Sequence, residues 1–295
     1  MSSPEIPQPC NPALLARIHQ LAVDIAREAG EQMLAGLERP LDVEYKSEGR
    51  SGAAPTNPVT DVDRAVERFA HERVAAAFPD HGFLGEEGGE VGAEGRFLWA
   101  IDPVDGTTNY SNRFPLFAAS VACLHDGVPI AGAIWCSTTP YLRPGVYHTA
   151  QGAPLLFEGE EAALPPTSVL RPLAAAPGGS PGRTKEWDNR VTGCAAIECA
   201  FVAAGVFRLA RFNPLNVWDV AAGIALAWSA GKQVWVREDG RWRPFERFRP
   251  PAPKREAGLR AWRSALIIGE PEAVTAVVAP ARPRWARLQL RLPWR

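Results

Sequence analysis

The sequence lacks several patterns that other classes of protein require. Its five cysteines are odd in number and include no CxxC pair, so neither a disulfide framework nor a zinc site is indicated. No apolar run approaches the roughly 18 residues that span a bilayer. The first ten residues, MSSPEIPQPC, lack both the basic region and the apolar core of a secretory signal. We therefore expect a cytoplasmic protein with no membrane partner.

The sequence also lacks histidines at metal-ligand spacing, and its last residues lack acids. The five histidines show no metal-ligand spacing, and we assign none of them a direct role. Residues 241–295 carry 13 Lys+Arg against 4 Asp+Glu, a balance of +9 that leaves −10 for residues 1–240. Clustered Arg and Trp in the acid-free end, ARPRWARLQLRLPWR, suit RNA, but a surface or dimer-packing role is the simpler interpretation. Nucleic acid is therefore not the expected partner.

Periodic hydrophobic residues predict most of the regular elements. Apolar residues recur at helical spacing after Asn11 and Pro12 and predict a long helix that ends near residue 36. A second helix is expected from about residue 61 to the proline at 79, and strands at 96–102 and 116–135, the latter a hairpin with an Asp-Gly turn. Helix and strand pairs follow near 193–212 and 218–236. Residues 137–190 are uninformative apart from short strand candidates such as GVYHTA.

Carboxylates stand at the ends of four of these predicted elements. They are Asp63, the Glu86–Glu87 pair, Asp102 with Asp105, and Asp219. Two carboxylates three residues apart repel each other, and one is pushed toward protonation unless a cation lies between them. Mg²⁺ prefers such oxygen ligands, and paired metals can clamp the attacking and leaving oxygens of phosphoryl transfer. Taken singly, each has a simpler interpretation as a helix cap, a solvated loop or a turn.

Five motifs together give the carboxylates a common context. VTDVDRAVE, LGEEGG, WAIDPVDGTTNY, GCAA and WDVAAG resemble, in this order, the inositol monophosphatase family of Mg²⁺-dependent, lithium-sensitive phosphatases. The resemblance implies an α+β fold, a layered α/β/α/β/α sandwich of the inositol monophosphatase and fructose-1,6-bisphosphatase type. It implies one domain over residues 12–279, with sheet-containing halves of about 12–140 and 141–279, a basic tail at 280–295, and a homodimer.

The resemblance also implies a metal centre. It assigns two to three Mg²⁺ ions to Glu86, Asp102, the carbonyl of Val104, Asp105 and Asp219. Glu87 would lie beside the site without a certain ligand role.

Catalytic and substrate-binding roles follow in the same way. Asp63 and Thr107, with Glu86, would prepare the attacking water, and the N–H groups of Gly106 and Thr107 would hold the phosphate. Asp105, Asp219, Cys194 and Phe212 would also border the substrate, and for Cys194 packing is expected rather than nucleophilic attack. Phe212 stands where inositol-type enzymes carry a glutamate, although an alignment shift of one residue would change this. Lys46, which matches the lysine before the family's mobile loop, is equally explained as a surface residue. The segment after Lys46 is expected to be a mobile loop or an open hairpin.

The predicted function is Mg²⁺-dependent hydrolysis of a small inositol, sugar or nucleotide phosphate by metal-activated water. One alternative is a catalytically weak family member that acts as a binding or regulatory module, with RNA contacted through its basic tail. A second is a haloacid-dehalogenase-type phosphatase, whose DxDGT motif is one residue shorter than DPVDGT here. A covalent aspartyl phosphate would distinguish that second class.

Overall fold

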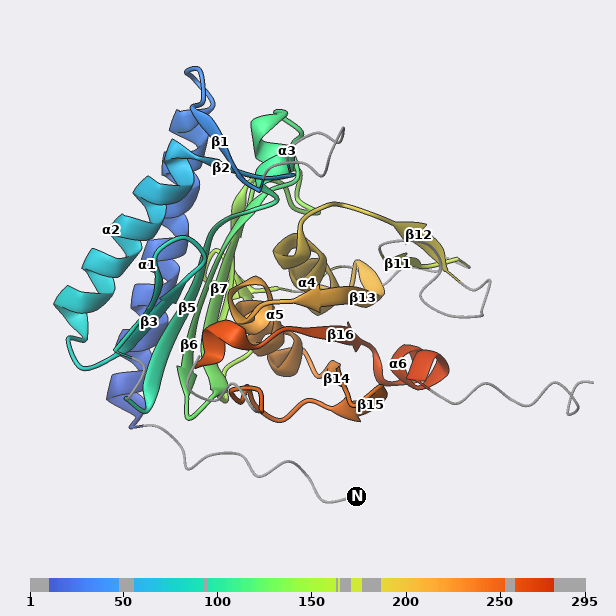
Figure 1. The fold of residues 1–295 in the computed structure, drawn as a ribbon. Helices are drawn as coiled ribbons and strands as arrows, with labels where there is room; N and C mark the ends of the chain where they lie inside the picture. Colours follow the sequence, from blue (N-terminus) through green and yellow to red (C-terminus); the bar gives the residue numbers. More distant parts are fainter. Residues whose placement is uncertain are drawn as a thin grey trace, which may run out of the picture.

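The computed structural model describes residues 11–47, 56–92, 95–162, 164, 171–176, 187–252 and 258–278. Its elements form five layers (Figure 1). Helices α1 (Pro12–Gly36) and α2 (Asp61–Ala77) cover one face of an eight-stranded sheet, and α4 (Ala195–Ala203) and α5 (Val217–Ser229) separate that sheet from a six-stranded one. Helix α6 (Pro271–Val278) packs on the far face of the second sheet. The predicted α+β sandwich is confirmed.

The eight-stranded sheet has the order β10-β9-β8-β7-β6-β5-β3-β4, and β3 and β5 are its parallel pair. Its strands are β3 (Gly82–Gly85), β4 (Gly89–Val91), β5 (Phe97–Asp105), β6 (Ala118–His125), β7 (Val128–Cys136), β8 (Gly145–Ala150), β9 (Leu156–Phe157) and β10 (Glu160–Glu161). The expected division near residue 140 is therefore misplaced, because the chain turns back after β7 and adds three antiparallel strands to the same sheet.

The six-stranded sheet has the order β12-β11-β13-β16-β14-β15. Its strands are β11 (Leu173–Ala175), β12 (Asp188–Arg190), β13 (Phe207–Leu215), β14 (Gln233–Glu238), β15 (Arg241–Pro244) and β16 (Ser264–Gly269). A short 3-10 helix, η2 (Leu259–Ala261), precedes β16. The basic tail predicted at 280–295 lies outside the described residues.

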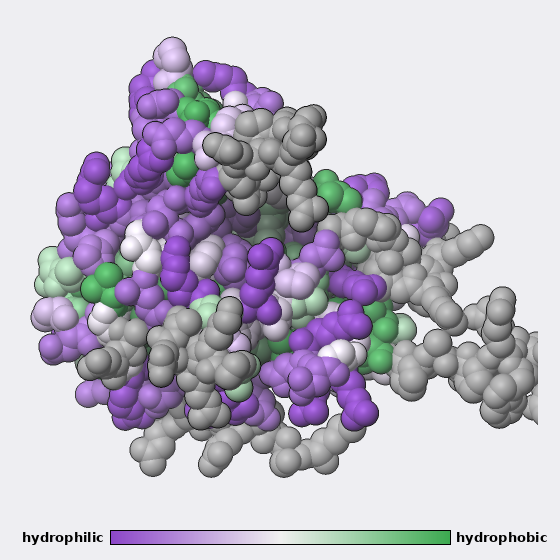
Figure 2. Space-filling view, viewed as in Figure 1, coloured by the Kyte–Doolittle hydropathy of each residue, from purple (hydrophilic) through white to green (hydrophobic). Residues whose placement is uncertain are grey.

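A small hairpin and a single helical turn stand beside the two sheets. Strands β1 (Val43–Ser47) and β2 (Thr56–Thr60) pair antiparallel, which confirms the open-hairpin alternative, while residues 48–55 between them lie outside the described part. Helix α3 (Thr107–Ser111) follows β5 directly. No described helix combines the length and the apolar character needed to cross a membrane. On the face in Figure 2, hydrophilic residues dominate and the hydrophobic ones form small separate groups.

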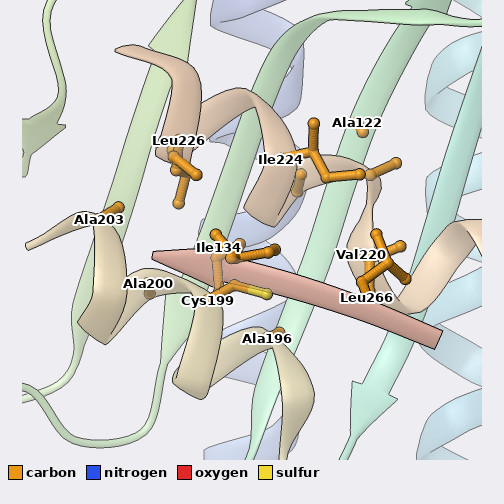
Figure 3. Packing of buried hydrophobic residues seen from close by; sticks show 14 of the residues in the cluster. Ala122, Ile134, Ala196, Cys199, Ala200, Ala203, Val220, Ile224, Leu226 and Leu266 are labelled. Carbon is orange, nitrogen blue, oxygen red and sulfur yellow. The ribbon is translucent and has the colours of Figure 1, made fainter. Parts of the chain in front are cut away.

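Close packing fixes the position of α5 between the sheets. A Cβ on Gly132 of β7 would lie 2.9 Å from the carbonyl oxygen of Ala222, and a Cβ on Gly223 would collide with the Cβ and Sγ of Cys199 on α4. These contacts require glycine, because an added methyl group would collide with backbone or with a neighbouring helix. Figure 3 shows the surrounding apolar side chains, including Ile134 and Leu226, filling the space between the layers. The middle of α5 is therefore packed closely between β7 of the eight-stranded sheet and α4.

Candidate active site

The predicted carboxylates come together from four elements. Glu86 follows β3, Asp102 lies in β5 with Asp105 at its end, and Asp63 and Asp219 lie in the first turns of α2 and α5. Burial, and then the negative charges of Glu86, Asp105, Asp219 and Asp63, hold the pKa of Asp102 well above its usual range. Such mutual repulsion shows that all five acids share one electrostatic environment.

The DPVDGT turn presents both side-chain and backbone oxygens. Asp102 is 2% exposed, and its Oδ1 accepts a 3.1 Å hydrogen bond from the backbone N–H of Val104. The hydroxyl of Thr107 lies 2.8 Å from the carbonyl oxygen of Val104. Gly106 has φ 82° and ψ 37°, a left-handed conformation that favours glycine and turns the chain from β5 into α3. The turn thus places the Val104 carbonyl next to the Thr107 hydroxyl.

Asp63 serves as a helix cap and also faces Thr107. Its Oδ2 accepts a 2.8 Å bond from the N–H of Thr60 within a capping box, as well as a bond from the Thr60 hydroxyl. Its Oδ1 lies 3.3 Å from Thr107 Oγ1. Burial raises the pKa of Asp63 to about 6 against the Thr60 hydrogen bonds, with further repulsion from Glu87 and Glu86. Asp63 is therefore a helix cap that also lies next to Thr107, while the predicted role of the two residues toward water stays a prediction.

Asp105 and Asp219 each engage donors of the protein itself. Asp105 Oδ2 accepts the N–H of Ala196 in the first turn of α4, and lies 3.4 Å from Cys194 Sγ. Asp219 Oδ2 accepts a 2.7 Å bond from the N–H of Asn216, again within a capping box. Burial raises the pKa of each carboxyl to about 7, and repulsion by neighbouring carboxylates adds to this shift. The hydrogen bonds lower the pKa but do not cancel the shift.

Two predicted substrate contacts are buried residues. Cys194 is 1% exposed, and burial followed by the charge of Asp105 raises the pKa of its thiol well above normal, as expected for packing rather than for a nucleophile. Phe212 is 4% exposed within the main hydrophobic core and pairs with Leu266 of β16. Their contacts with a substrate stay predictions.

Lys46 lies on the Glu86–Glu87 pair. Its Nζ is 2.7 Å from Glu86 Oε1 and 2.5 Å from Glu87 Oε1. The Lys46 ammonium therefore pairs with both carboxylates. Burial alone would lower the pKa of Lys46, but the hydrogen bonds and charges of both glutamates outweigh burial and raise it. Lys46 is thus paired with the predicted site carboxylates and is not a plain surface lysine.

Glu67 is a site residue that sequence reasoning missed. This glutamate is 6% exposed, and its carboxylate accepts the N–H of Glu87 at 2.7 Å and the N–H of Gly88. It therefore holds the turn that carries Glu86. A signal was present in the sequence, because Glu67 follows Asp63 by four residues and must share its helix face.

The donor set suits a hard divalent cation. All of the assembled groups are oxygen donors, and the raised pKa values of Asp102, Asp105 and Asp219 are what a nearby cation would relieve. In the part of the chain that the structure describes, no three His, Cys, Asp or Glu side chains form a group able to hold one ion. Each acid is instead turned toward a donor of the chain. The residues therefore fit the cation chemically, and ligation requires them to exchange those hydrogen bonds for it.

Comparisons with known proteins identify the family of the chain. The model of the inositol monophosphatase family matches residues 14–261. Phosphatase IMPL1, chloroplastic, of Arabidopsis thaliana is 28% identical over 255 residues, covering 80% of this chain and 66% of that protein. Nus factor SuhB of Pseudomonas aeruginosa is 32% identical over 235 residues, covering 72% of this chain and 83% of its own. The solved structure of extragenic suppressor protein suhB from Bartonella henselae superposes with a TM-score of 0.67 and 25% identity, over 86% and 94% of the two chains. The chain belongs to the inositol monophosphatase family.

Proposed function

We propose that this protein is a Mg²⁺-dependent phosphomonoesterase that hydrolyses a small phosphorylated metabolite by direct attack of water. The observation that carries the proposal is the convergence of mutually repelling carboxylates from four elements beside the Asp63–Thr107 pair. The chloroplastic relative that is named a phosphatase supports it.

Five groups of the chain would hold the cations: the carboxylates of Glu86, Asp102, Asp105 and Asp219 and the carbonyl of Val104. Two to three bound Mg²⁺ ions would neutralise the phosphate, acidify water and stabilise the departing alkoxide. The cation-binding carboxylates are rigidly placed, because they stand at strand ends and in capped helix turns.

Asp63 and Thr107 would prepare the water. A carboxylate whose pKa is about 6 is deprotonated at neutral pH and remains basic enough to accept a proton. The Thr107 hydroxyl, held between Val104 O and Asp63 Oδ1, would orient the water while Asp63 takes its proton. The N–H groups of Gly106 and Thr107 would bind phosphate oxygens. The new P–O bond forms from water as the bond to the leaving alcohol breaks, with inversion at phosphorus.

A screen of inositol, sugar and nucleotide phosphates tests this proposal. Wild-type protein with Mg²⁺ should release phosphate from at least one ester, and chelation or Asp102→Asn should abolish the release. No hydrolysis across the panel would refute the proposal. Retention of configuration with a chiral phosphate, or a phosphoaspartate at Asp102, would favour the dehalogenase-type alternative.

The substrate proposal rests on Phe212. A phenyl ring cannot accept hydrogen bonds from polyol hydroxyls, and each unpaired buried hydroxyl costs roughly 1–3 kcal/mol. We therefore expect myo-inositol 1-phosphate to be a poorer substrate than another sugar or nucleotide phosphate. Phe212 is buried in the core, so Phe212→Glu would bury a charge and unfold the protein. We therefore compare kcat/KM for inositol, sugar and nucleotide phosphates in the wild type and in Phe212→Leu. Inositol phosphate as the best wild-type substrate would contradict the proposal.

A regulatory function is the second candidate, because the Pseudomonas aeruginosa relative carries the name Nus factor. A binding module would retain an RNA or protein interaction in Asp102→Asn and lose it when residues 280–295 are removed. Together with the enzyme we propose a cytoplasmic homodimer, which sedimentation of the full chain at several concentrations would test.

A further inference from the structure

Arg260 of η2 also bonds to the Glu86 turn, through backbone groups other than those that Glu67 binds. Its Nη1 donates a 2.8 Å hydrogen bond to the carbonyl of Gly85, and its Nη2 donates a 3.2 Å bond to the carbonyl of Glu86. The two acceptors lie 175 and 174 residues away in the sequence. One planar guanidinium thus bonds two successive carbonyls, which a lysine ammonium cannot do in the same fixed geometry.

The contact is reciprocal. Glu90 of β4 accepts a 3.0 Å bond from the backbone N–H of Arg260 and a 3.4 Å bond from that of Leu259. A Cβ on Gly258 would lie 2.3 Å from Glu90 Oε2, so only glycine lets this carboxylate reach the η2 backbone without a shift. The η2 segment and the β3–β4 hairpin therefore hold each other through side chains of both.

Arg260 also reaches the first turn of α5. Its guanidinium carbon lies 5.4 Å from the ring centroid of Trp218, the residue before Asp219. Trp218 is 7% exposed, and its backbone carbonyl accepts a hydrogen bond from the hydroxyl of Ser120 on β6. This bond anchors Trp218 to the eight-stranded sheet. A guanidinium over an indole face is a favourable cation–π contact. Arg260 consequently connects the residues beside two of the assigned cation ligands.

The Glu86 turn is held in two complementary ways. Glu67 accepts the N–H groups of Glu87 and Gly88, whereas Arg260 donates to the carbonyls of Gly85 and Glu86. A hydrogen-bonded carbonyl on each side of the Glu86 Cα limits rotation of the backbone there, and thereby sets the direction of its side chain.

We propose that Arg260 is a positioning residue that fixes the Glu86 turn against the start of α5 and so sets the affinity of the site for its divalent cation. The inference rests on the proposed function, in which Glu86 and Asp219 hold that cation. In this role Arg260 is not a ligand of the cation, and it acts through the backbone of Glu86 and the ring of Trp218.

The test compares Arg260→Met with Arg263→Met in the full chain. Arg263 is a matched control, because it is an exposed arginine three residues later whose Nε donates a 3.2 Å bond to the carbonyl of Pro214. Calorimetric titration with Mg²⁺ should give a dissociation constant at least about tenfold higher for Arg260→Met, as for other losses of groups that orient ligands. Arg263→Met should stay within about twofold, and Arg260→Lys should fall between the two.

Two further readouts separate positioning from general damage. Amide exchange in metal-free protein should speed up in peptides covering residues 83–91 of Arg260→Met and remain unchanged elsewhere. The Mg²⁺ concentration for half-maximal activity should rise while kcat at saturating Mg²⁺ changes little. Should Arg260→Met fail to fold, Arg260→Lys carries the same measurements.

Two outcomes have distinct meanings. A wild type that binds no Mg²⁺ refutes the proposed function, whereas a wild type that binds it with an affinity equal to that of Arg260→Met and Arg260→Lys refutes the positioning role. Faster exchange at residues 83–91 without any change in Mg²⁺ affinity would also overturn the inference, since the contact would then serve stability alone.

Discussion

The first turns of α2 and α5 are built alike, yet their aspartates face different chemistry. Each helix begins with a capping box whose third residue is aspartate, Asp63 behind Thr60 and Asp219 behind Asn216. Other carboxylates repel both aspartates, but the remaining oxygen of Asp63 also faces the Thr107 hydroxyl. One aspartate can therefore cap a helix and also be available for a second role. The capping box holds one carboxylate oxygen, and the packing of the other elements determines which group lies next to the second oxygen.

Replacing Asp102, whose pKa is raised by burial and then by the neighbouring carboxylates, the two helix aspartates included, should have the largest effect. We expect Asp102→Asn to lower kcat by about a thousandfold or more, because a ligand shared by the cations is lost. The same change should raise the melting temperature in EDTA, since it removes a buried and repelled carboxylate while the amide still accepts the Val104 N–H. Activity assays and thermal melts on one preparation measure the expected fall in kcat and the expected rise in melting temperature. A lower melting temperature of Asp102→Asn in EDTA would contradict the proposed repulsion between the carboxylates.

The two aspartates can be separated by matched substitutions. Asparagine at either position keeps an acceptor for the N-cap, so both variants should fold. Asp63→Asn should lose about 10²–10⁴-fold in kcat at an unchanged Mg²⁺ requirement, the usual range for a general base. Asp219→Asn should mainly raise the Mg²⁺ concentration for half-maximal activity. The same kinetic pattern in both variants would erase the proposed division of roles.

Elements with a local signal were predictable from the sequence. The helix from Pro12 and the Asp126–Gly127 turn follow from periodicity and from residues that tolerate positive φ, which are 50° and 79° here. Strand β8 was predicted as the candidate GVYHTA, which the structure confirms. Strands β9 to β12 were not assigned, because each has only two or three residues and is specified by its neighbours in the sheet.

The candidate site also has a part that the sequence predicted and a part that it did not. Its carboxylates were predictable because each lies at the end of a recognisable element and the motifs resemble a known family. The contacts of Lys46 with Glu86, and of Arg260 with the same turn, join residues 40 and 174 positions apart. Such pairs depend on how whole layers pack, and no local pattern in a single sequence specifies them.

The free energy of unfolding of the metal-free protein should depend on pH through two of the buried carboxyls. Asp105 and Asp219 have pKa values of about 7 when folded against 3.8 normally, so the folded state binds more protons between about pH 4 and 7. The contribution of these two carboxyls to the free energy of unfolding is fully present below about pH 4 and is lost as pH rises through 7, by roughly a few kcal/mol. Chemical denaturation in EDTA at stepped pH measures this slope, which Asp219→Asn should reduce. An unchanged slope in that variant would contradict the assignment.

A smaller effect of opposite sign should come from α1 and β8, far from the carboxylates in sequence. His148 Nδ1 lies 2.8 Å from His19 Nε2, and burial lowers the pKa of His148 to about 4 from 6.5. The unfolded chain binds this proton first, so stability falls as pH drops from about 6.5 toward 4, by about 2 kcal/mol. His148→Gln should remove this loss, and His71→Gln, at an exposed histidine of α2, is the control. Equal slopes in both variants would refute the prediction.

Mg²⁺ binding itself tests the central claim most directly. Calorimetric titration of the wild type at about pH 7, repeated in two buffers of different ionisation enthalpy, should show saturable binding with release of protons, because carboxyls with raised pKa values must deprotonate to ligate. Asp102→Asn should bind much more weakly, and Asp63→Asn should bind nearly as well as the wild type. No binding by the wild type, or equal binding by all three proteins, would contradict the assignment of these carboxylates to a divalent cation.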